Sequence, residues 1–251
     1  MRLYGRMVGL DVHRSQYPPF VWQMVHGVYE REIIEEMVQC LPEGGAFVDI
    51  GANIGYVTVV AARRTGPQGR VYSFEPNPVL FPTLSKNANR YPCVTAFNKA
   101  AGRTAGELPF YMGDNSDTGS FSKDFVKLFP CKAMTETLVP ICRVEGALQE
   151  MNQAHVDVLK LDVEGFELEA LAGLGSYLDP KVTTHLFVEI MPRAQRASGH
   201  TTRDLLAFVA ENGYRIFGTE TPWKDREILP ENHQALEDEL GETYTTIHCR
   251  G

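Results

Sequence analysis

The stretch that most restricts the fold of this chain is a short apolar segment that runs into a turn bounded by glycines. Phe47 to Ile50 is apolar except for Asp49, Gly51 to Gly55 forms the turn, and Tyr56 to Arg64 then has the composition of a helix. A strand, a glycine turn and a helix in this order begin a βα nucleotide site. The glycines remove side chains that would keep a ligand off the backbone, and we expect the amides at the helix start to face the ligand.

The spacing within this turn separates two classes of cofactor. A dinucleotide site needs the pattern G-x-G-x-x-G, and counted from Gly51 this chain has Asn53 and Tyr56 where the second and third glycines belong. The turn lacks the glycine that lets a pyrophosphate approach, so it fits a ligand with adenosine and no phosphates. A dinucleotide oxidoreductase is therefore disfavoured.

A second acidic residue supports the same type of ligand. Glu75 ends the predicted strand Arg70–Phe74 and lies 24 residues after Gly51. An acid at the tip of the second strand can accept hydrogen bonds from both ribose hydroxyls, and it would repel a 2′-phosphate. The turn and this acid together indicate S-adenosylmethionine (SAM) as the cofactor.

Four motifs, in order, resemble those of one enzyme family. They are Asp49-Ile-Gly-Ala-Asn-Ile-Gly55, Phe74-Glu75-Pro76, Asn98-Lys99-Ala100 and Leu159-Lys-Leu-Asp-Val-Glu-Gly-Phe-Glu167. This arrangement resembles the FkbM family of class I SAM-dependent methyltransferases, and the resemblance covers roughly Tyr29 to Glu189. The first motif alone indicates a class I methyltransferase, and the last is the family-specific part.

The alternation of predicted strands and helices favours an α/β fold with a Rossmann-like, mostly parallel sheet. We expect seven strands, and a final hairpin would make the last one antiparallel. The expected strands are Phe47–Ile50, Arg70–Phe74, Val94–Asn98, Val156–Leu161, His185–Ile190, Tyr214–Phe217 and Tyr244–Cys249. The expected helices between them cover residues 56–64, 77–90, 144–151, 165–174 and 201–212.

Two additions to this sheet are expected. Residues 1–40 would form an N-terminal arm and helical lid, and residues 41–251 the SAM-binding domain. A small β insertion at about residues 103–143 contains the alternating stretches Glu107–Met112 and Leu138–Arg143. The polar loop Gly113–Ser122 between them either contacts the substrate or is a solvent-exposed connection.

The motifs and the resemblance together give a set of cofactor-binding residues. Asp49 is expected to hold the glycine turn or the methionine amine, and Glu75 the ribose. The Tyr29-Glu30 pair resembles the segment that closes over the cofactor in this family, although a solvated helix start is an equal alternative. The full set is Tyr29, Glu30, Asp49, Gly51, Ala52, Asn53, Gly55, Tyr56, Glu75, Pro76, Asn98, Lys99, Ala100 and Asp162.

Acidic residues at the strand ends are the candidates for catalysis. Ligands of a doubly wound sheet lie at the carboxyl ends of the strands, which places Asp162, Glu164 and Glu189 towards the transferred methyl group. A hydroxyl acceptor must lose a proton, and Asp162 or Glu164 is the first choice for the general base if burial or a like charge raises its pKa. His26 is a second choice.

A magnesium ion is an alternative at the same strand ends. Catechol-type methyltransferases hold Mg²⁺ between acids in the positions of Asp162 and Glu189, and oxygen ligands suit this ion. Here Ile190 follows the second acid, where those enzymes have Asn. We therefore assign no metal ligand. The histidines show no mutual metal spacing either.

Charge and composition exclude several partners. The net charge of −8 and the absence of a basic run argue against nucleic acid. Five scattered cysteines read as reduced thiols of a cytoplasmic protein, and no apolar run is long enough to cross a membrane. A homodimer remains open. The family resemblance implies O-methylation of a small molecule, either a sugar or a secondary metabolite. N-methylation of a small amine and a SAM-binding module without catalysis are the alternatives.

Overall fold

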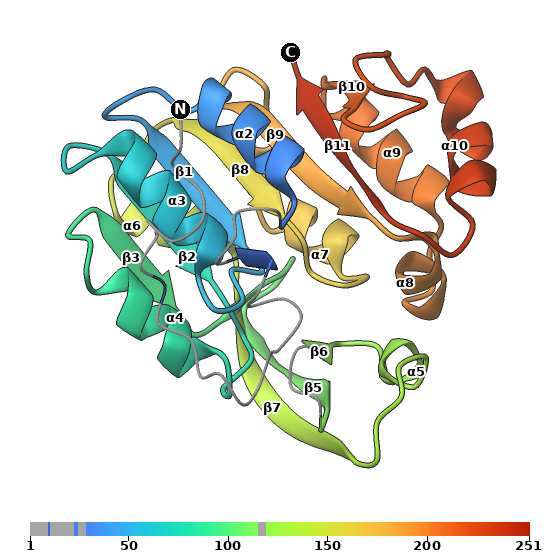
Figure 1. Cartoon of the computed structure of the whole chain (residues 1–251), viewed down its shortest axis with the longest axis horizontal. Coiled ribbons are helices and arrows are strands. Elements are labelled where there is room, and N and C mark those ends of the chain that lie inside the picture. Colours follow the sequence, from blue (N-terminus) through green and yellow to red (C-terminus); the bar gives the residue numbers. More distant parts are fainter. Residues whose placement is uncertain (1–9, 11–22, 25–28, 115–118) are drawn as a thin grey trace.

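The computed structural model describes residue 10 and residues 23–24, 29–114 and 119–251, which are built around a seven-stranded sheet (Figure 1). Its strands are β1 (Ala46–Ile50), β2 (Arg70–Phe74), β3 (Val94–Phe97), β8 (Val156–Leu161), β9 (Thr183–Ile190), β10 (Arg215–Gly218) and β11 (Thr245–Arg250). Their spatial order is β10-β11-β9-β8-β1-β2-β3, and only β11 runs antiparallel to its neighbours. The predicted Rossmann-like sheet with an antiparallel last strand is confirmed.

Helices cover both faces of this sheet, so its strands are apolar on both sides. Phe47 of β1 points to the face covered by α2 (Arg31–Cys40) and α3 (Tyr56–Thr65), while its neighbour Val48 points to the opposite face. That second face carries α6 (Val144–Glu150), α7 (Glu167–Ala172) and α9 (Thr202–Glu211). The remaining helices include α4 (Phe81–Ala88), α8 (Pro192–Ala197) and α10 (His233–Leu240). No helix in the described part of the chain is long and apolar enough to span a bilayer.

A second, four-stranded sheet occupies the region where a β insertion is expected. Its strands are β4 (Ala100–Ala101), β5 (Gly106–Gly113), β6 (Gly119–Ser120) and β7 (Met134–Cys142), in the order β4-β7-β5-β6. The two predicted strands correspond to β5 and β7. A one-turn helix, α5 (Lys123–Val126), follows β6 and lies beside it at the edge of the molecule (Figure 1).

Several helices differ from the sequence-based expectation. The predicted helix 165–174 begins later, at Glu167, because Gly165 has φ +96° and breaks the helical backbone. It continues as a separate 3₁₀ turn, Gly175–Tyr177. The helix after β2 begins at Phe81 instead of Asn77, since the Asn77 side chain accepts a hydrogen bond from the Val79 amide at 2.9 Å and forms a turn.

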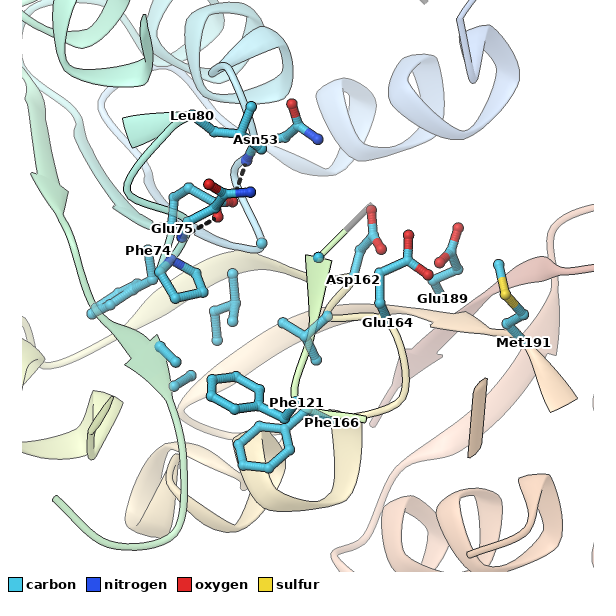
Figure 2. Close-up of a pocket in the computed structure, with 18 of the residues that line it drawn as sticks. Asn53, Phe74, Glu75, Leu80, Phe121, Asp162, Glu164, Phe166, Glu189 and Met191 are labelled. Atoms are coloured by element: carbon cyan, nitrogen blue, oxygen red, sulfur yellow. Dashed lines mark hydrogen bonds between the residues drawn. The ribbon is translucent and has the colours of Figure 1, made fainter. Parts of the chain in front are cut away.

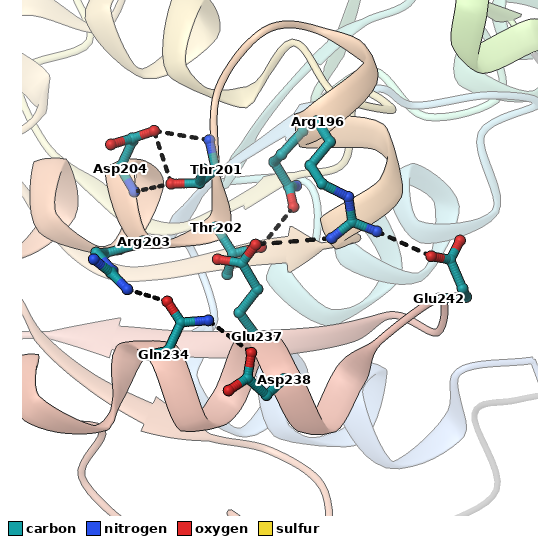
Figure 3. Close-up of polar contacts among 10 residues, drawn as sticks. Arg196, Thr201, Thr202, Arg203, Asp204, Gln234, Glu237, Asp238 and Glu242 are labelled. Carbon is teal, nitrogen blue, oxygen red and sulfur yellow. Dashed lines mark hydrogen bonds and ion pairs between the residues drawn. The ribbon is translucent and has the colours of Figure 1, made fainter.

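Polar contacts join α8, α9 and α10 beside the sheet (Figure 3). Arg196 of α8 lies 3.7 Å from Glu237 of α10 and 3.0 Å from Glu242. Thr201 caps α9 reciprocally with Asp204: the Thr201 hydroxyl accepts from the Asp204 amide at 3.1 Å, and the Asp204 carboxylate accepts from the Thr201 amide at 2.8 Å. This capping box fixes the start of α9.

We expect Thr201→Ala to destabilise the protein by about 1 kcal/mol, because the Asp204 amide at the start of α9 loses its acceptor and the Asp204 carboxylate loses the Thr201 hydroxyl as a donor. Urea denaturation measures the change. Thr201→Ser keeps the hydroxyl and is the matched control, expected to unfold close to the parent. Equal midpoints for the alanine and serine variants would show that the cap contributes nothing.

Candidate functional site

A cavity of about 360 Å³ lies at the carboxyl ends of β1, β2, β8 and β9. At this place the chain leaves the neighbouring strands β1 and β8 towards opposite faces of the sheet. Figure 2 shows Asn53 and Glu75 at one end and the carboxylates of Asp162, Glu164 and Glu189 gathered at the other. The volume lies within the range of small-molecule sites, about 300–1,000 Å³.

The glycine turn after β1 is set by the closeness of β8. Gly51 has φ +82°, and a Cβ at this position would lie 1.7 Å from the carbonyl oxygen of Asp162. The Asp162 amide in turn donates to the carbonyl of Ile50 at 3.0 Å. Only glycine lets the chain turn out of β1 at this distance from its neighbour.

The backbone amides of this turn are used within the protein. Each amide from Gly51 to Gly55 donates to a protein acceptor; in chain order these are the Phe74 carbonyl twice, the Glu75 carboxylate, the Asn53 side chain and the Ala52 carbonyl. The expectation that the amides at the helix start face a ligand is wrong for Gly55, the residue that precedes α3. Three of the five acceptors belong to Phe74 and Glu75 at the end of β2, and none of the five amides is left for a phosphate group.

Glu75 is a buried acid with acceptor capacity to spare. Its two carboxylate oxygens accept from the amides of Asn53 and Asn77, both at 2.8 Å. Only 6% of the residue is exposed, and burial raises its pKa to about 7 against the effect of these bonds. A carboxylate offers about four acceptor positions, so each oxygen retains one that can face the cavity.

Three further carboxylates share the opposite end of the cavity. The oxygens of Asp162, Glu164 and Glu189 lie within 4.8 Å of one another. Burial and the charge of Asp162 raise the pKa of Glu164 to about 8 and that of Glu189 well above its usual range. Asp162 is paired with Lys160, 2.9 Å away. A cluster of three carboxylates is stabilised in its ionised form by a neighbouring positive charge.

Glu164 is held in an unusual backbone conformation. Its φ is +53°, in the left-handed region that non-glycine residues rarely adopt, and its carbonyl accepts from the Ser120 hydroxyl at 2.8 Å. One carboxylate oxygen, Oε2, is buried and has no hydrogen-bond partner among the described residues. Strain and an unpaired buried oxygen on the same residue mark a functional position.

A buried network behind Glu164 keeps this strained turn in place. Glu167 accepts from the Gly165 amide at 2.8 Å and from the Gln195 side chain at 3.2 Å. Gln195 accepts in turn from the Thr202 hydroxyl at 3.1 Å. Glu167 is 1% exposed and lies outside the cavity, so it positions the loop.

The residues before α2 close one side of the cavity. Tyr29 and Glu30 both line it, and the Tyr29 ring meets the Tyr56 ring edge-on at 6.0 Å. Burial, followed by the charge of Glu30, raises the pKa of Tyr29 well above its usual value. Burial also raises the pKa of Glu30 to about 7. The N-terminal segment therefore adds another acid to this end of the cavity.

A model of the methyltransferase FkbM domain matches residues 49–216, which span the sheet from β1 to β10 and both ends of the cavity. The chain belongs to the FkbM methyltransferase family. The expected family is thereby confirmed, and the chain is a methyltransferase by family.

Individual relatives are more distant. The hexuronic acid methyltransferase AglP of Haloferax volcanii is 26% identical over 186 residues, which cover 67% of this chain and 72% of AglP. Methyltransferase 1 of Beauveria bassiana is 34% identical over 149 residues, 53% of this chain and 59% of that protein. The FkbM methyltransferase of Methylobacillus flagellatus has a similar fold, with a TM-score of 0.50 at 17% identity; the match covers 84% of this chain and 44% of that one.

In this FkbM methyltransferase the cavity brings together ten of the residues proposed from the sequence. They are Tyr29, Glu30, Gly51, Asn53, Glu75, Pro76, Ala100, Asp162, Glu164 and Glu189. Six others lie outside the lining: Asp49, Ala52, Gly55, Tyr56, Asn98 and Lys99. Asp49 is fully buried on β1 and accepts from the Thr58 hydroxyl at 2.6 Å. The Asn98 side chain donates to the carbonyls of Glu75 and Pro76. His26 lies outside the described residues.

The apolar and cationic lining of the cavity was not predicted from the sequence. Phe121 and Phe166 lie together at one side of it, with ring centroids 4.3 Å apart (Figure 2). Arg193 also lines it, its guanidinium 4.9 Å from the ring centre of Phe129. Phe166 lies within the family-specific motif, and this position could have predicted that it lines the cavity. No local pattern marks Arg193 or Phe129 as neighbours of a ligand.

We expect Gly51→Ala to destabilise the protein by more than about 2 kcal/mol, because a Cβ cannot fit against the Asp162 carbonyl and φ is positive. Gly106→Ala is the control, since nothing lies within 4 Å of a Cβ there. Urea denaturation compares the two variants. If both unfolded at the parent's midpoint, the close approach of β1 and β8 would not govern this turn.

Proposed function

We propose that this protein transfers a methyl group from SAM to a hydroxyl group of a small molecule, a sugar or a secondary metabolite. The observation that carries the proposal is the division of one cavity into two acidic ends. Glu75 lies buried at one end, with acceptor positions to spare, and Asp162, Glu164 and Glu189 lie at the other. Two ribose hydroxyls suit the first end, and a positive charge suits the second.

The residues present fit SAM without a phosphate-binding element. Glu75 would hold the ribose, and Pro76 and Ala100 line the cavity near it. Ala101 and Phe166 also line the cavity and would give the adenine an apolar contact. When bound, SAM supplies a methyl group on a positively charged sulfur. The three carboxylates would face that positive charge. Burial and mutual repulsion disfavour their ionised forms, and a positive charge beside them would offset this effect.

Glu164 is the proposed general base. The acceptor hydroxyl gives its proton to the Glu164 carboxylate as its oxygen takes the methyl group. Asp162 is engaged by Lys160, whereas Glu164 has an unpaired buried oxygen and a pKa raised to about 8, close to the pH at which a base must both accept and release protons. Holding the reactants together in a dry cavity supplies the rest of the acceleration.

The acceptor side of the cavity supports a polar, acidic acceptor. Arg193 is the one cationic side chain among the described residues of the lining, and it lies beside Met191 and Phe129. A guanidinium recognises a carboxylate in a planar, paired geometry. The name of AglP, a hexuronic acid methyltransferase, supports an acidic sugar as the first class of acceptor to test.

We expect Glu75→Ala to weaken the binding of S-adenosylhomocysteine at least tenfold, which corresponds to about 1.4 kcal/mol, because both ribose hydroxyls lose their acceptor. Isothermal titration calorimetry measures this. Glu107→Ala, at an exposed position on β5, is the control and should bind like the parent. Unchanged affinity in Glu75→Ala would remove the basis of the cofactor assignment.

We expect Glu164→Gln to lower kcat by about 10²–10⁴-fold while S-adenosylhomocysteine binding is retained, since only the base is lost. In the parent, kcat should rise with pH towards the raised pKa of Glu164, because the ionised form is the active one. The variant should lack this dependence. S-adenosylhomocysteine release with a panel of hexuronic acids and other hydroxyl acceptors measures turnover.

Glu169→Gln is the matched control, because Glu169 lies on the same loop-helix unit but pairs with Arg103 outside the cavity. Turnover after removal of divalent ions tests the alternative role of the three carboxylates. Full activity without added Mg²⁺ supports the role of Glu164 as the general base. An absolute requirement for Mg²⁺ would instead make them metal ligands, and cofactor binding without turnover on any acceptor would favour a binding module.

A further inference from the structure

A second cluster of titratable side chains lies away from the cavity. Cys40 at the end of α2, His185 on β9 and His248 on β11 bring one sulfur and two ring nitrogens within 4.8 Å of one another. His185 precedes Glu189 by four residues on the same strand, which is about 13 Å. The cluster therefore lies towards the other end of the sheet, between α2 and the strands β9 and β11 (Figure 1).

A hydrogen-bond chain orients the two imidazoles. His248 Nδ1 lies 2.7 Å from the Glu36 carboxylate, and His248 Nε2 lies 2.9 Å from His185 Nδ1. A carboxylate accepts from Nδ1–H, and in the neutral ring this leaves the Nε2 lone pair to accept from His185 Nδ1, with the Cys40 sulfur within 4.8 Å. A carboxylate behind a histidine is the usual support of a metal-bound imidazole.

Packing holds the central ring in this orientation. His248 is 3% exposed, and its ring stacks on that of Phe187 with centroids 4.2 Å apart and an interplanar angle of 11°. The His185 ring lies beside it at 5.0 Å. The imidazole on β11 is therefore fixed by the sheet, whereas Cys40 approaches from the helix that covers it.

We propose that Cys40, His185 and His248 bind a zinc ion. The ligand atoms would be Cys40 Sγ, His185 Nδ1 and His248 Nε2, and water would complete a tetrahedral set. Small rotations bring the three atoms to the usual distances, about 2.0–2.1 Å for nitrogen and about 2.3 Å for sulfur. The Cys40 thiol releases one proton on binding, and the His185 proton moves from Nδ1 to Nε2.

The charges around the cluster allow this ion. Glu36 and the thiolate of Cys40 together balance the two positive charges of zinc, and Asp157 lies close enough to influence His185. Arg250 is a positively charged side chain near both Cys40 and His185, and it would repel a bound cation. Sulfur and imidazole ligands select zinc over Mg²⁺, which prefers the oxygen ligands of the active-site carboxylates.

Zinc at this place would fasten α2 to the sheet. α2 contributes Cys40 and the supporting Glu36, and the residue that precedes it, Glu30, lines the cavity. The helix is ten residues long, about 15 Å, so the ion would lie one helix length from the cavity wall. The site does not depend on the proposed methyl transfer, and its test needs no acceptor.

The test is zinc binding by the whole chain after metal is stripped with chelator. The parent should rebind one zinc per chain, and Cys40→Ser and His248→Gln should bind it at least tenfold more weakly. Glu36→Gln, which removes no ligand, should weaken binding less. Cys131→Ser and His155→Gln are matched controls outside the cluster, and both should bind zinc like the parent. With cobalt in place of zinc, the parent should show a thiolate-to-metal absorption band that Cys40→Ser lacks.

Circular dichroism of the metal-free variants establishes that they are folded, and zinc should raise the thermal midpoint of the parent but not of Cys40→Ser. Serine is close in size to cysteine, so this variant decides the matter if His248→Gln fails to fold. A parent that binds no zinc would overturn the proposal. So would zinc that persists unchanged in Cys40→Ser, or cobalt bound without the thiolate band, because either result places the ion on other ligands such as the active-site carboxylates.

Discussion

The buried ammonium of Lys160 is the interaction on which the acidic edge of the sheet depends. It lies 2.9 Å from Asp162 and 3.4 Å from the Gly51 carbonyl, so it joins the ends of β8 and β1. Burial lowers the pKa of Lys160, but its attraction to Asp162, Asp49 and Glu30 outweighs burial and raises the pKa above its usual value. Without this cation, Asp162 would lose its ion-pair partner in a partly dry space that it shares with other carboxylates.

The sheet could be predicted closely because its strands carry two signals at once. The central strands β1, β2 and β8 are mostly apolar, and each is followed directly by a glycine or an acid. Arg70–Phe74 and Val156–Leu161 agree with the structure to the residue. The elements that were missed, β4, β6 and α5, are two to four residues long, which is too short for a period to show. α8 and α10 were also missed: α8 begins at Pro192, α10 follows a 3₁₀ turn that begins at Pro230, and an ion pair between Arg196 and Glu237 joins the two helices.

The residues of the candidate site likewise fall into those that could be predicted from the sequence and those that could not. Acids that follow a strand directly, such as Glu75 and Asp162, could be placed at the cavity because the end of a parallel strand determines their position. The position of Asp49 could not be predicted in this way, because Asp49 lies one residue before the end of β1 and its buried side chain accepts a hydrogen bond from Thr58 of α3. Contacts between distant segments, such as Phe121 with Phe166 or His185 with His248, leave no local pattern.

The raised pKa values at the acidic end have a consequence for both stability and ligand choice. Glu164 and Glu189 bind protons more strongly in the folded protein than in the unfolded chain. Their contribution to stability is complete below the unfolded carboxyl pKa, about 4.3, and is lost as pH rises through the folded values. At pH values above the raised pKa of Glu164, about 8, the free protein therefore carries repulsion between these carboxylates that a bound cation relieves.

In the proposed reaction, that relief is available to the substrate and not to the product. The sulfonium of SAM is positive, whereas the sulfur of S-adenosylhomocysteine is neutral, so methyl transfer removes the charge that the carboxylates stabilise. The proton taken from the acceptor hydroxyl arrives at the same carboxylates and restores their neutral form. Under this proposal the acidic end would first attract the methyl donor, would then hold the proton of the acceptor hydroxyl, and would afterwards have no electrostatic attraction for the neutral product.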